Sequence, residues 1–276
     1  MRVDVVTLFP DVFQALDHSI PAKARKAGAL DLRVHALREF PLNRYGAVDD
    51  YPYGGEPGMV LHPQPLEQCL EKALEGREGV PVLHAHPRGK TLTQEDVRAW
   101  SKVPEVVLVC GHYKGLDERF RLKHVTHEFS IGDYVLSGGE TASLVWIDAV
   151  ARLLPGVLGD EGSALTDSFE TPLLGWPVYT RPEVWDGMRV PDALLSGHHD
   201  RIRQWKRLQQ MLLTRELRPD LWALHTLSKE DARLLVDAGI APEEVWSKFE
   251  SQTAPEVPDP AAKAASRDLA SDGSPS

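Results

Sequence analysis

A glycine-flanked apolar loop at residues 130–140 has the residue types of a small-molecule binding site. Gly132 and the pair Gly138-Gly139 flank the apolar triplet 134–136. Because glycine carries no side chain, it leaves backbone donors and acceptors open to close approach by a ligand. Such a loop has the hydrogen-bonding groups needed to read the edge of an adenine, so we expect it to form one wall of a pocket.

Two other segments combine glycine with apolar or aromatic residues. Residues 107–113 are an apolar run that ends near Gly111, and in open parallel sheets ligands lie at the carboxyl ends of the strands. Residues 51–59 are dense in glycine and proline beside two tyrosines. This composition suits either an ordinary surface turn or a loop that closes on a ligand, and the residues alone leave both open.

Three familiar site types are not expected. Residues 88–91, Arg-Gly-Lys-Thr, resemble the end of a phosphate-binding P-loop, but the first glycine of that motif would fall at His84. Residues 54–58 lack the Gly-x-Gly-x-x-Gly fingerprint and follow no strand pattern, which argues against a dinucleotide fold. The histidine pairs have no carboxylate or cysteine at ligand spacing, so we expect no structural metal site.

The elements that must position these segments alternate between strand and helix patterns. Strands are predicted at 2–8, 30–37, 80–84 and 105–111, and helices at 10–27, 64–75, 94–101 and 140–154. Thr93 is the predicted N-cap of the helix at 94–101. Strands separated by helices predict an α/β fold, with a parallel sheet covered by helices on both faces.

The chain is predicted to contain two domains and a tail. Residues 1–157 form the α/β domain, 158–172 lose periodicity and form an interdomain linker, and 173–250 form a small helical domain. Residues 251–276 consist mainly of proline, alanine, serine and aspartate, so we expect a disordered tail.

The overall composition is typical of a soluble globular protein. The chain has 276 residues, 42% hydrophobic and 26% charged, and no apolar run near the roughly 18 residues that a membrane span needs. Cys69 and Cys110 lie in apolar runs, which favours buried thiols in the cytoplasm over a disulfide. The net charge of -10 argues against nucleic acid, but fields are local, and basic residues cluster at 23–26 and 201–207.

Motifs that run in order along residues 1 to about 245 resemble the bacterial tRNA (guanine-N1)-methyltransferase family of the SPOUT superfamily. They are Tyr53–Met59, Leu108–Gly111, Ser130–Glu140, Pro155–Gly159, Asp167–Phe169, Tyr179–Pro182 and Leu194–Gly197. The resemblance implies an enzyme that methylates N1 of the guanine immediately 3′ of the anticodon in tRNA. It also implies a parallel sheet threaded as a deep trefoil knot, and an obligate homodimer whose active site lies at the subunit interface.

The resemblance also assigns the residues of the pocket. The methyl donor, S-adenosylmethionine, is expected to lie bent within the knot, with the 53–59 loop as a further wall. The expected donor-binding residues are Pro87, Gly111, Ile131, Gly132, Asp133, Tyr134, Val135, Leu136, Gly138 and Gly139.

Methylation of guanine N1 requires removal of the N1 proton, because that nitrogen is not nucleophilic while it is protonated. A general base near N1 and a donor or cation near O6, where negative charge develops, meet this need. The resemblance makes Asp167 the base and Arg152 the group that stabilises O6. From the residues alone, Asp167 also suits a helix N-cap or an Asx turn. Arg152 also suits an ion pair with Asp148, four positions earlier.

Lys114 departs from the pattern of the family. The family commonly has an acidic residue at this position, associated with magnesium dependence, and a charged lysine cannot ligate a cation. Mg²⁺ is therefore left open as a cofactor, and the usual arrangement of the metal is not expected. His112 stands where the family often has arginine, and it meets a phosphate only when protonated or as a neutral donor.

A helix predicted at 198–217 has an apolar face and a basic face. The basic residues are Arg201, Arg203, Lys206 and Arg207. A solvated surface is the ordinary interpretation of such a face. Beside a methyl-donor domain, contact with the phosphates of the tRNA anticodon arm is the favoured one, and it reconciles RNA binding with the acidic net charge.

Two other functions stay open. A non-catalytic RNA-binding protein that keeps the donor fold would need no base at Asp167. A nicotinamide-dependent oxidoreductase is the more remote alternative, because the glycine fingerprint of such enzymes is missing.

Overall fold

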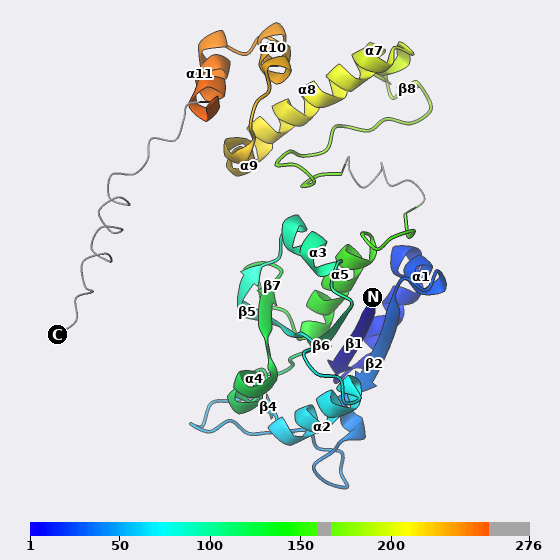
Figure 1. The fold of residues 1–276 in the computed structure, drawn as a ribbon, viewed down its shortest axis with the longest axis vertical. Helices are drawn as coiled ribbons and strands as arrows, with labels where there is room; N and C mark the ends of the chain where they lie inside the picture. The colour runs from blue at the N-terminus through cyan, green and yellow to red at the C-terminus, as the bar shows by residue number, and fades with distance from the viewer. Residues whose placement is uncertain (159–166, 254–276) are drawn as a thin grey trace, which may run out of the picture. The chain divides into compact units, whose positions relative to one another are not determined.

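The computed structural model of the chain describes residues 1–158 and 167–253, with side chains described as far as Phe249. It divides into two compact units, Met1–Glu170 and Thr171–Ser276, whose elements are coloured along the chain in Figure 1. The predicted linker at 158–172 and the predicted tail at 251–276 fall largely outside the described residues. Both therefore stay predictions.

The first unit is built on a five-stranded sheet in the order β2-β1-β6-β5-β7, with every neighbouring pair parallel. Its strands are β1 (Arg2–Thr7), β2 (Asp31–Ala36), β5 (Val82–Thr91), β6 (Glu105–Val109) and β7 (His127–Ser130). The α/β class with a parallel sheet, predicted from alternating strand and helix patterns, is confirmed. The knot stays a prediction.

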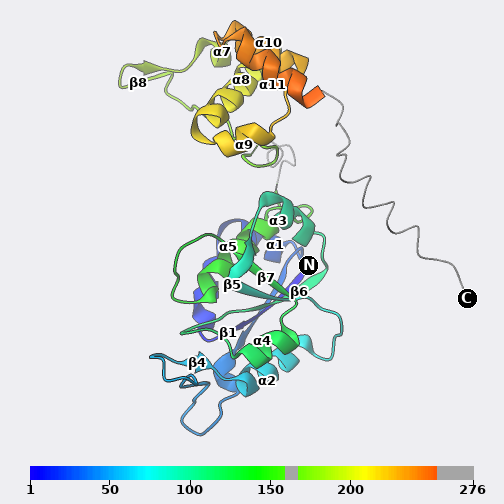
Figure 2. The same cartoon turned by 90° about the vertical axis from the view of Figure 1, so that its left-hand side faces the viewer.

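Helices cover both faces of this sheet, as Figure 2 shows. On one side are η1 (Pro10–Asp17), α1 (Ser19–Lys26), α3 (Gln94–Trp100) and α5 (Gly139–Ala151), and on the other are α2 (Pro63–Leu74) and α4 (Glu118–His124). Alternate residues of β6 enter two separate cores, Val106 and Leu108 the first, Val107 and Val109 the second. Because both faces are buried, this strand is continuously apolar, which explains its clear signal in the sequence.

The helical stretch predicted at 10–27 is divided into two helices. The chain forms the 3-10 helix η1, turns at Ser19 with a φ of 55°, and continues as α1. A 3-10 helix has about three residues per turn, so Phe13 and Leu16 fall on one face, and both are buried against the sheet. This packing outweighs the continuous helical pattern of the sequence.

Strand β5 is interrupted where it runs beside β7. It pairs with β7 at Leu83–Ala85 and again at Lys90–Thr91, with a shift of register between them. Pro87, which has no backbone donor, lies in the unpaired stretch. At Gly89 an added Cβ would lie 2.4 Å from the backbone nitrogen of Phe129. Glycine therefore lets the two strands approach this closely, and the interruption carries Pro87 out of the ladder.

A short antiparallel ribbon carries the 51–59 loop. Strand β3 (Asp49–Asp50) pairs with β4 (Val60–Leu61), and the loop connects them. The backbone N–H of Leu61 donates to the carbonyl of Gly115 at 3.0 Å, and that of Lys114 donates to the carbonyl of Met59 at 2.9 Å. The loop is thus fastened to the segment that follows β6.

The second unit is mainly helical. The domain bounds 173–250 stay a prediction. Its helices are α7 (Asp192–Leu195), α8 (His199–Leu217), α9 (Pro219–Leu224), α10 (Lys229–Asp237) and α11 (Pro242–Thr253). Its core contains Leu173, Met211, Leu227, Ala232, Leu235 and Val245. A hairpin of β8 (Val184–Trp185) and β9 (Met188–Arg189) was not predicted. Its turn is Asp186-Gly187, both with positive φ, and Asp-Gly strongly favours such a two-residue turn.

Both cysteines are free and buried, which confirms the prediction of buried thiols. Burial raises the pKa of Cys69 to about 12. Burial, assisted by the charge of Glu140, also raises the pKa of Cys110, whose sulfur lies 3.3 Å from the hydroxyl of Ser143. No helix within residues 1–158 and 167–253 is long and apolar enough to cross a membrane.

Candidate functional site

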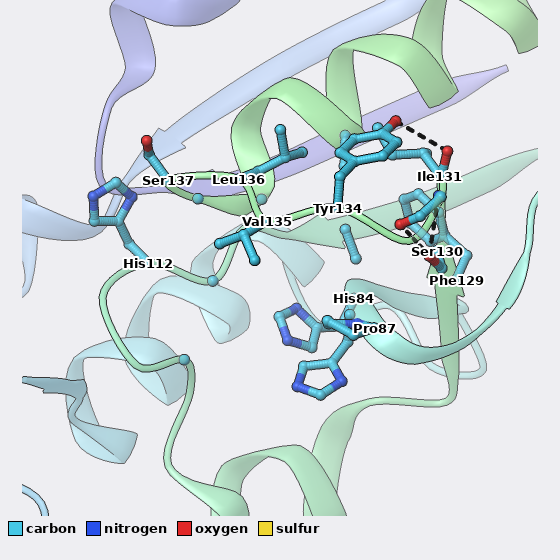
Figure 3. Close-up of a pocket in the computed structure, with 18 of the residues that line it drawn as sticks. His84, Pro87, His112, Phe129, Ser130, Ile131, Tyr134, Val135, Leu136 and Ser137 are labelled. Carbon is cyan, nitrogen blue, oxygen red and sulfur yellow. Dashed lines mark hydrogen bonds between the residues drawn. The ribbon is translucent and has the colours of Figure 1, made fainter. Parts of the chain in front are cut away.

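The middle of β5, the end of β7 and the segments that follow β6 and β7 meet at a pocket of about 270 Å³ (Figure 3). Its walls come from residues 84–87, 111–115, 129–132 and 134–139, with Ala142 of α5. This is the carboxyl edge of the sheet, where parallel α/β folds bind their ligands. All of the predicted donor-binding residues except Asp133 line this pocket.

Tyr134 folds the 131–136 loop on itself. Its hydroxyl donates to the carbonyl of Ile131 at 3.0 Å, and its backbone N–H donates to the carbonyl of Gly132 at 3.1 Å (Figure 3). Gly132 has a φ of 142°, and an added Cβ would lie 2.5 Å from the Tyr134 ring. Val135, the next residue, is 98% exposed. The loop therefore has a fixed shape and presents an apolar side chain outward.

Gly138 and Gly139 bring the start of α5 against the end of β6. The N–H of Gly139 donates to the carbonyl of Gly111 at 2.7 Å, and an added Cβ on Gly139 would lie 2.9 Å from the Gly111 nitrogen. At Gly138 an added Cβ would lie 2.3 Å from both Nδ1 of His112 and Oε2 of Glu140. A larger residue at either position would push these segments apart, so the glycine pair sets the shape of the pocket.

His84 is a buried histidine in the pocket wall. Its Nδ1 lies 2.9 Å from the carbonyl oxygen of Val109, so Nδ1 carries the proton and Nε2 keeps its lone pair. Burial lowers the pKa of His84, which favours this neutral form. Its place in the pocket was not predicted, although its position at the carboxyl end of the predicted 80–84 strand was an available signal.

Glu140, in the first turn of α5, is a buried carboxylate beside the pocket. The hydroxyl of Thr7 donates to its Oε1 at 2.9 Å, and Nδ1 of His112 lies 3.6 Å from its Oε2. The N-terminal end of a helix favours negative charge, which stabilises this carboxylate. His112 lies at the edge of the pocket near Ser137 (Figure 3), and its Nδ1 makes no hydrogen bond with the residues that the structure describes.

The 53–59 loop, predicted as a further wall, is fully described, and none of its residues lines the pocket. It approaches the pocket through Lys114, whose Nζ lies 3.9 Å from a carboxylate oxygen of Glu56. The alkyl chain of Lys114 covers Gly58, where an added Cβ would lie 3.1 Å from its Cγ. In the described part of the chain, no group of three or more His, Cys, Asp or Glu side chains is arranged to hold a metal ion.

Arg152 and Asp167, predicted from the resemblance to act together, are in direct contact. Nη2 of Arg152 donates to Oδ2 of Asp167 at 2.5 Å, and the two side chains are 41% and 52% exposed. The alternative partner of Arg152, Asp148, is exposed, and no ion pair joins these two described residues. In the folded chain Arg152 therefore pairs with Asp167, which is distant in sequence, and not with Asp148 of α5.

This ion pair and the pocket lie at opposite ends of α5. Gly139, the first residue of the helix, lines the pocket, and Arg152 follows its last residue, Ala151. The helix has 13 residues, which at 1.5 Å per residue gives a length of about 20 Å. A small molecule bound in the pocket therefore does not reach the ion pair of the same chain.

The basic residues predicted to bind RNA have different surroundings. Arg201 and Arg203 are exposed, and Arg203 pairs with Asp200 on the same helix at 3.0 Å. Lys206 lies over the ring of Trp176, with Nζ 4.6 Å from its centroid. Arg201 is therefore accessible to an external anion, Arg203 is exposed but already paired with Asp200, and Lys206 is partly engaged.

Arg207 binds a buried carboxylate within the second unit. Its guanidinium donates to Asp231 at 2.7 and 2.9 Å, and Asp231 also accepts the N–H of Ser228 in the N-terminal cap of α10. His225 is buried beside this pair, and burial, with the charge of Arg207, lowers its pKa to about 4. Arg207 thus has a structural role, and its contact with RNA stays a prediction.

The whole of the first unit and much of the second match a known family. The family model described as tRNA (Guanine-1)-methyltransferase TrmD matches residues 1–224. A relative from Halalkalibacterium halodurans, named tRNA (guanine-N(1)-)-methyltransferase, is 48% identical over 237 residues, which are 85% of this chain and 96% of the relative. Proteins of the same name from Clostridium beijerinckii and Clostridium perfringens (strain 13 / Type A) are each 46% identical over 235 residues. Those matches cover 85% of this chain, and 98% and 99% of the two relatives.

Proposed function

The chain belongs to the tRNA (guanine-1)-methyltransferase family and is therefore a tRNA methyltransferase, and we propose that its target is N1 of the guanine immediately 3′ of the anticodon. The observation that carries this proposal is the ion pair of Arg152 with Asp167, which is complementary to guanine. No observation favours a non-catalytic RNA-binding protein or a nicotinamide-dependent oxidoreductase.

The residues of the pocket suit S-adenosylmethionine as the methyl donor. Gly111, Gly138 and Gly139 line the pocket, and an added Cβ at any of them would collide with a neighbouring protein atom. They keep the pocket walls free of side chains there, which lets an adenosyl moiety approach the backbone. Neutral His84 adds one hydrogen-bond acceptor at the pocket wall. When bound, S-adenosylmethionine supplies a methyl group on a positively charged sulfur, which a nucleophile can attack.

The ion pair suits the Watson–Crick edge of guanine. That edge presents the N1–H donor next to the O6 acceptor, and the pair presents the Asp167 carboxylate next to the Arg152 guanidinium. With guanine and the donor bound, Asp167 would accept the N1 proton as N1 takes the methyl carbon, and the bond between that carbon and the donor's sulfur would break to release the neutral thioether S-adenosylhomocysteine. Arg152 would donate to O6, where negative charge develops. When guanine binds, the contact between Arg152 and Asp167 is thus replaced by two hydrogen bonds, one from N1–H to Asp167 and one from Arg152 to O6.

A second copy of the chain completes the proposed active site. Because about 20 Å of α5 separates the pocket from the ion pair, the pocket of one protomer must face the Arg152–Asp167 pair of the other. Val135 and Val145 are apolar residues, 98% and 44% exposed, on the pocket loop and on α5. Their burial between two protomers would remove apolar surface from water. The proposed assembly is a homodimer with two shared sites.

The trefoil knot and the RNA contact are proposed on the same family basis. The close approach of Gly139 to Gly111 supports a threaded arrangement of the segments around the pocket. Arg201 and Arg203 are exposed cations that suit the phosphates of the anticodon arm. Because the net charge is -10, RNA binding depends on such local basic surface.

The function is tested by incubating the purified full-length protein and S-adenosylmethionine with tRNA transcripts. Mass spectrometry identifies the modified nucleoside. A transcript with guanine 3′ of the anticodon is expected to gain 1-methylguanosine, and a transcript with adenine there is expected to gain none. Methylation of another position, or of both transcripts, would contradict the proposed target.

The shared active site is tested by mixing two inactive chains with different affinity tags. One chain carries Asp167→Asn, and the other carries Gly139→Val in the pocket. Each mixed dimer should regain one active site, where the intact pocket of the first chain faces the intact Asp167 of the second. Mixed dimers that form but show no activity would contradict the arrangement.

A further inference from the structure

The turn that carries Asp167 is fastened to α3 three residues later, at Glu170. Nε2 of Gln94 donates to Oε1 of Glu170 at 2.7 Å, and Nε of Arg98 donates to Oε2 at 3.2 Å. The Glu170 side chain is only 11% exposed, so water screens these contacts far less than those of an open surface pair. Both carboxylate oxygens of Glu170 therefore have donors from a single helix.

Arg98 also holds the backbone of the turn. Its Nη2 donates to the carbonyl oxygens of Phe169 at 3.4 Å and of Glu170 at 3.2 Å. Phe169 has a φ of 72°, a conformation that residues with a side chain adopt infrequently. The N–H of Glu170 lies 3.5 Å from the carbonyl oxygen of Asp167 and closes the turn. One guanidinium thus binds both the side chain and the main chain of this segment.

Helix α3 is a firm anchor for these contacts. A capping box of Thr93 and Asp96 closes its N-terminal end. At its other end Trp100 packs against Trp146 of α5, with ring centroids 6.1 Å apart. Helix α5 leads directly into Arg152. The two contacts that hold the Asp167 turn, one from Arg152 and one from α3, therefore come from two helices packed on each other.

We propose that Gln94, Arg98 and Glu170 form a latch that positions the carboxylate of Asp167 for proton abstraction. The latch rests on the proposed function, in which Asp167 is the base. Glu170 touches no reacting atom and is a positioning residue. Glu170 is also the last residue of the first unit. The latch therefore fixes the chain immediately after the Asp167 turn, before it continues at Thr171.

Glu170→Ala removes the contacts of the latch and does not alter the side chains of Arg152, Asp167 or the pocket residues themselves. We expect kcat to fall on the order of 10- to 100-fold, because small displacements of a catalytic group have effects of that size. The calorimetric affinity for S-adenosylhomocysteine should stay within about twofold, since the pocket lies at the far end of α5. Amide hydrogen exchange in residues 167–170 should rise, and this readout does not depend on activity.

The matched control is Glu95→Ala, which removes an exposed carboxylate from the same helix and should change neither kcat nor exchange. The reciprocal double variant, Arg98→Glu with Glu170→Arg, restores an ion pair of reversed polarity and should recover part of kcat. A purely structural role would lower thermal stability without separating kcat from donor binding.

Two results would overturn the latch, and they are distinguishable. If Asp167→Asn abolishes methylation while Glu170→Ala keeps wild-type kcat, the latch fails and the proposed function stands. If Asp167→Asn keeps full activity, the proposed base is wrong, and the latch fails with it as a catalytic device even where exchange rises in Glu170→Ala.

Discussion

Arg152 and Asp167 lie 15 positions apart in the sequence, and their side chains form one ion pair at the carboxyl end of α5. Each side chain is about half exposed, so solvent screening leaves the pair a small contribution to folding stability. Its pairing of an acceptor with a donor matches one edge of guanine. The proposed function gives the pair a second role, in recognition of the target base.

Asp167→Asn removes the proposed base and keeps the size of the side chain. We expect methylation to fall by about 100- to 10,000-fold, with the affinity for S-adenosylhomocysteine unchanged. Methyl incorporation and calorimetry measure the two effects. Asp148→Asn removes an exposed carboxylate from α5 that does not pair with Arg152, and it should keep wild-type activity. A similar loss in both variants would contradict the assignment of Asp167.

Gly139→Ala places a methyl group 2.9 Å from the backbone nitrogen of Gly111. Overpacking of this kind destabilises by about 1–3 kcal/mol, so donor affinity should fall about 10- to 100-fold as the pocket segments separate. Gly28→Ala is the control, because Gly28 has a φ of 72° and no atom near its added Cβ. It should cost about 1 kcal/mol of folding stability and leave calorimetric donor affinity unchanged.

Methyl transfer is expected to continue in the presence of EDTA. Lys114 lies at the pocket edge beside Glu56, and its ammonium group supplies positive charge where it cannot ligate a metal. Initial rates should be measured with prefolded tRNA and with spermidine added, so that the RNA keeps its fold without magnesium. Activity that EDTA abolishes and magnesium alone restores would show that another group ligates the metal.

Arg201→Ala and Arg203→Ala should each weaken tRNA binding and reduce the slope of affinity against salt by about 1, because each removes one phosphate contact. Thermal stability should not change. Arg207→Ala is the contrasting variant, since it strands the buried carboxylate of Asp231 and should destabilise the second unit by about 3 kcal/mol. Fluorescence anisotropy over a salt series and thermal unfolding separate the two outcomes.

His225 makes the stability of the second unit depend on pH. Its pKa is about 4 in the folded protein, against an ordinary value of 6.5, so the unfolded chain binds the proton more readily. Stability is full above pH 6.5 and is lost as the pH falls from 6.5 toward 4, by about 3 kcal/mol.

This loss is measured by urea unfolding across that pH range, with amide exchange in α8 and α10 reporting on the second unit. His225→Gln should flatten the dependence. His199→Gln changes an exposed histidine at the start of α8 and should retain the dependence. An equal flattening by both variants would assign the effect to another group.

The sheet and the pocket could be predicted because their signals are local. Strand β6 is buried on both faces and is therefore apolar throughout. Gly111 lies two residues after it and Gly138-Gly139 stand at the start of α5, so these positions in the pocket wall were visible as glycines at element ends. In an open parallel sheet such ends converge on one edge.

The features that were missed depend on contacts between distant residues. The helical spacing at 10–27 is continuous, yet burial of Phe13 and Leu16 favours a 3-10 helix there. The partner of Arg152 lies 15 positions away, beyond the reach of the four-residue spacing that suggested Asp148. The Asp186-Gly187 dipeptide is a sequence signal for a two-residue hairpin turn, but helical patterns dominate the surrounding sequence.

Cys110 directly precedes Gly111 of the pocket wall, and its surroundings make its thiol a poor nucleophile. A sulfonium methyl donor is an alkylating agent, and the thiolate is the form of cysteine that reacts with such agents. Burial raises the pKa of Cys110 and keeps its sulfur protonated, 1% of the residue is exposed, and Ser143 lies against it. With the proposed donor bound against Gly111, this buried and protonated thiol would not compete with the tRNA base for the methyl group.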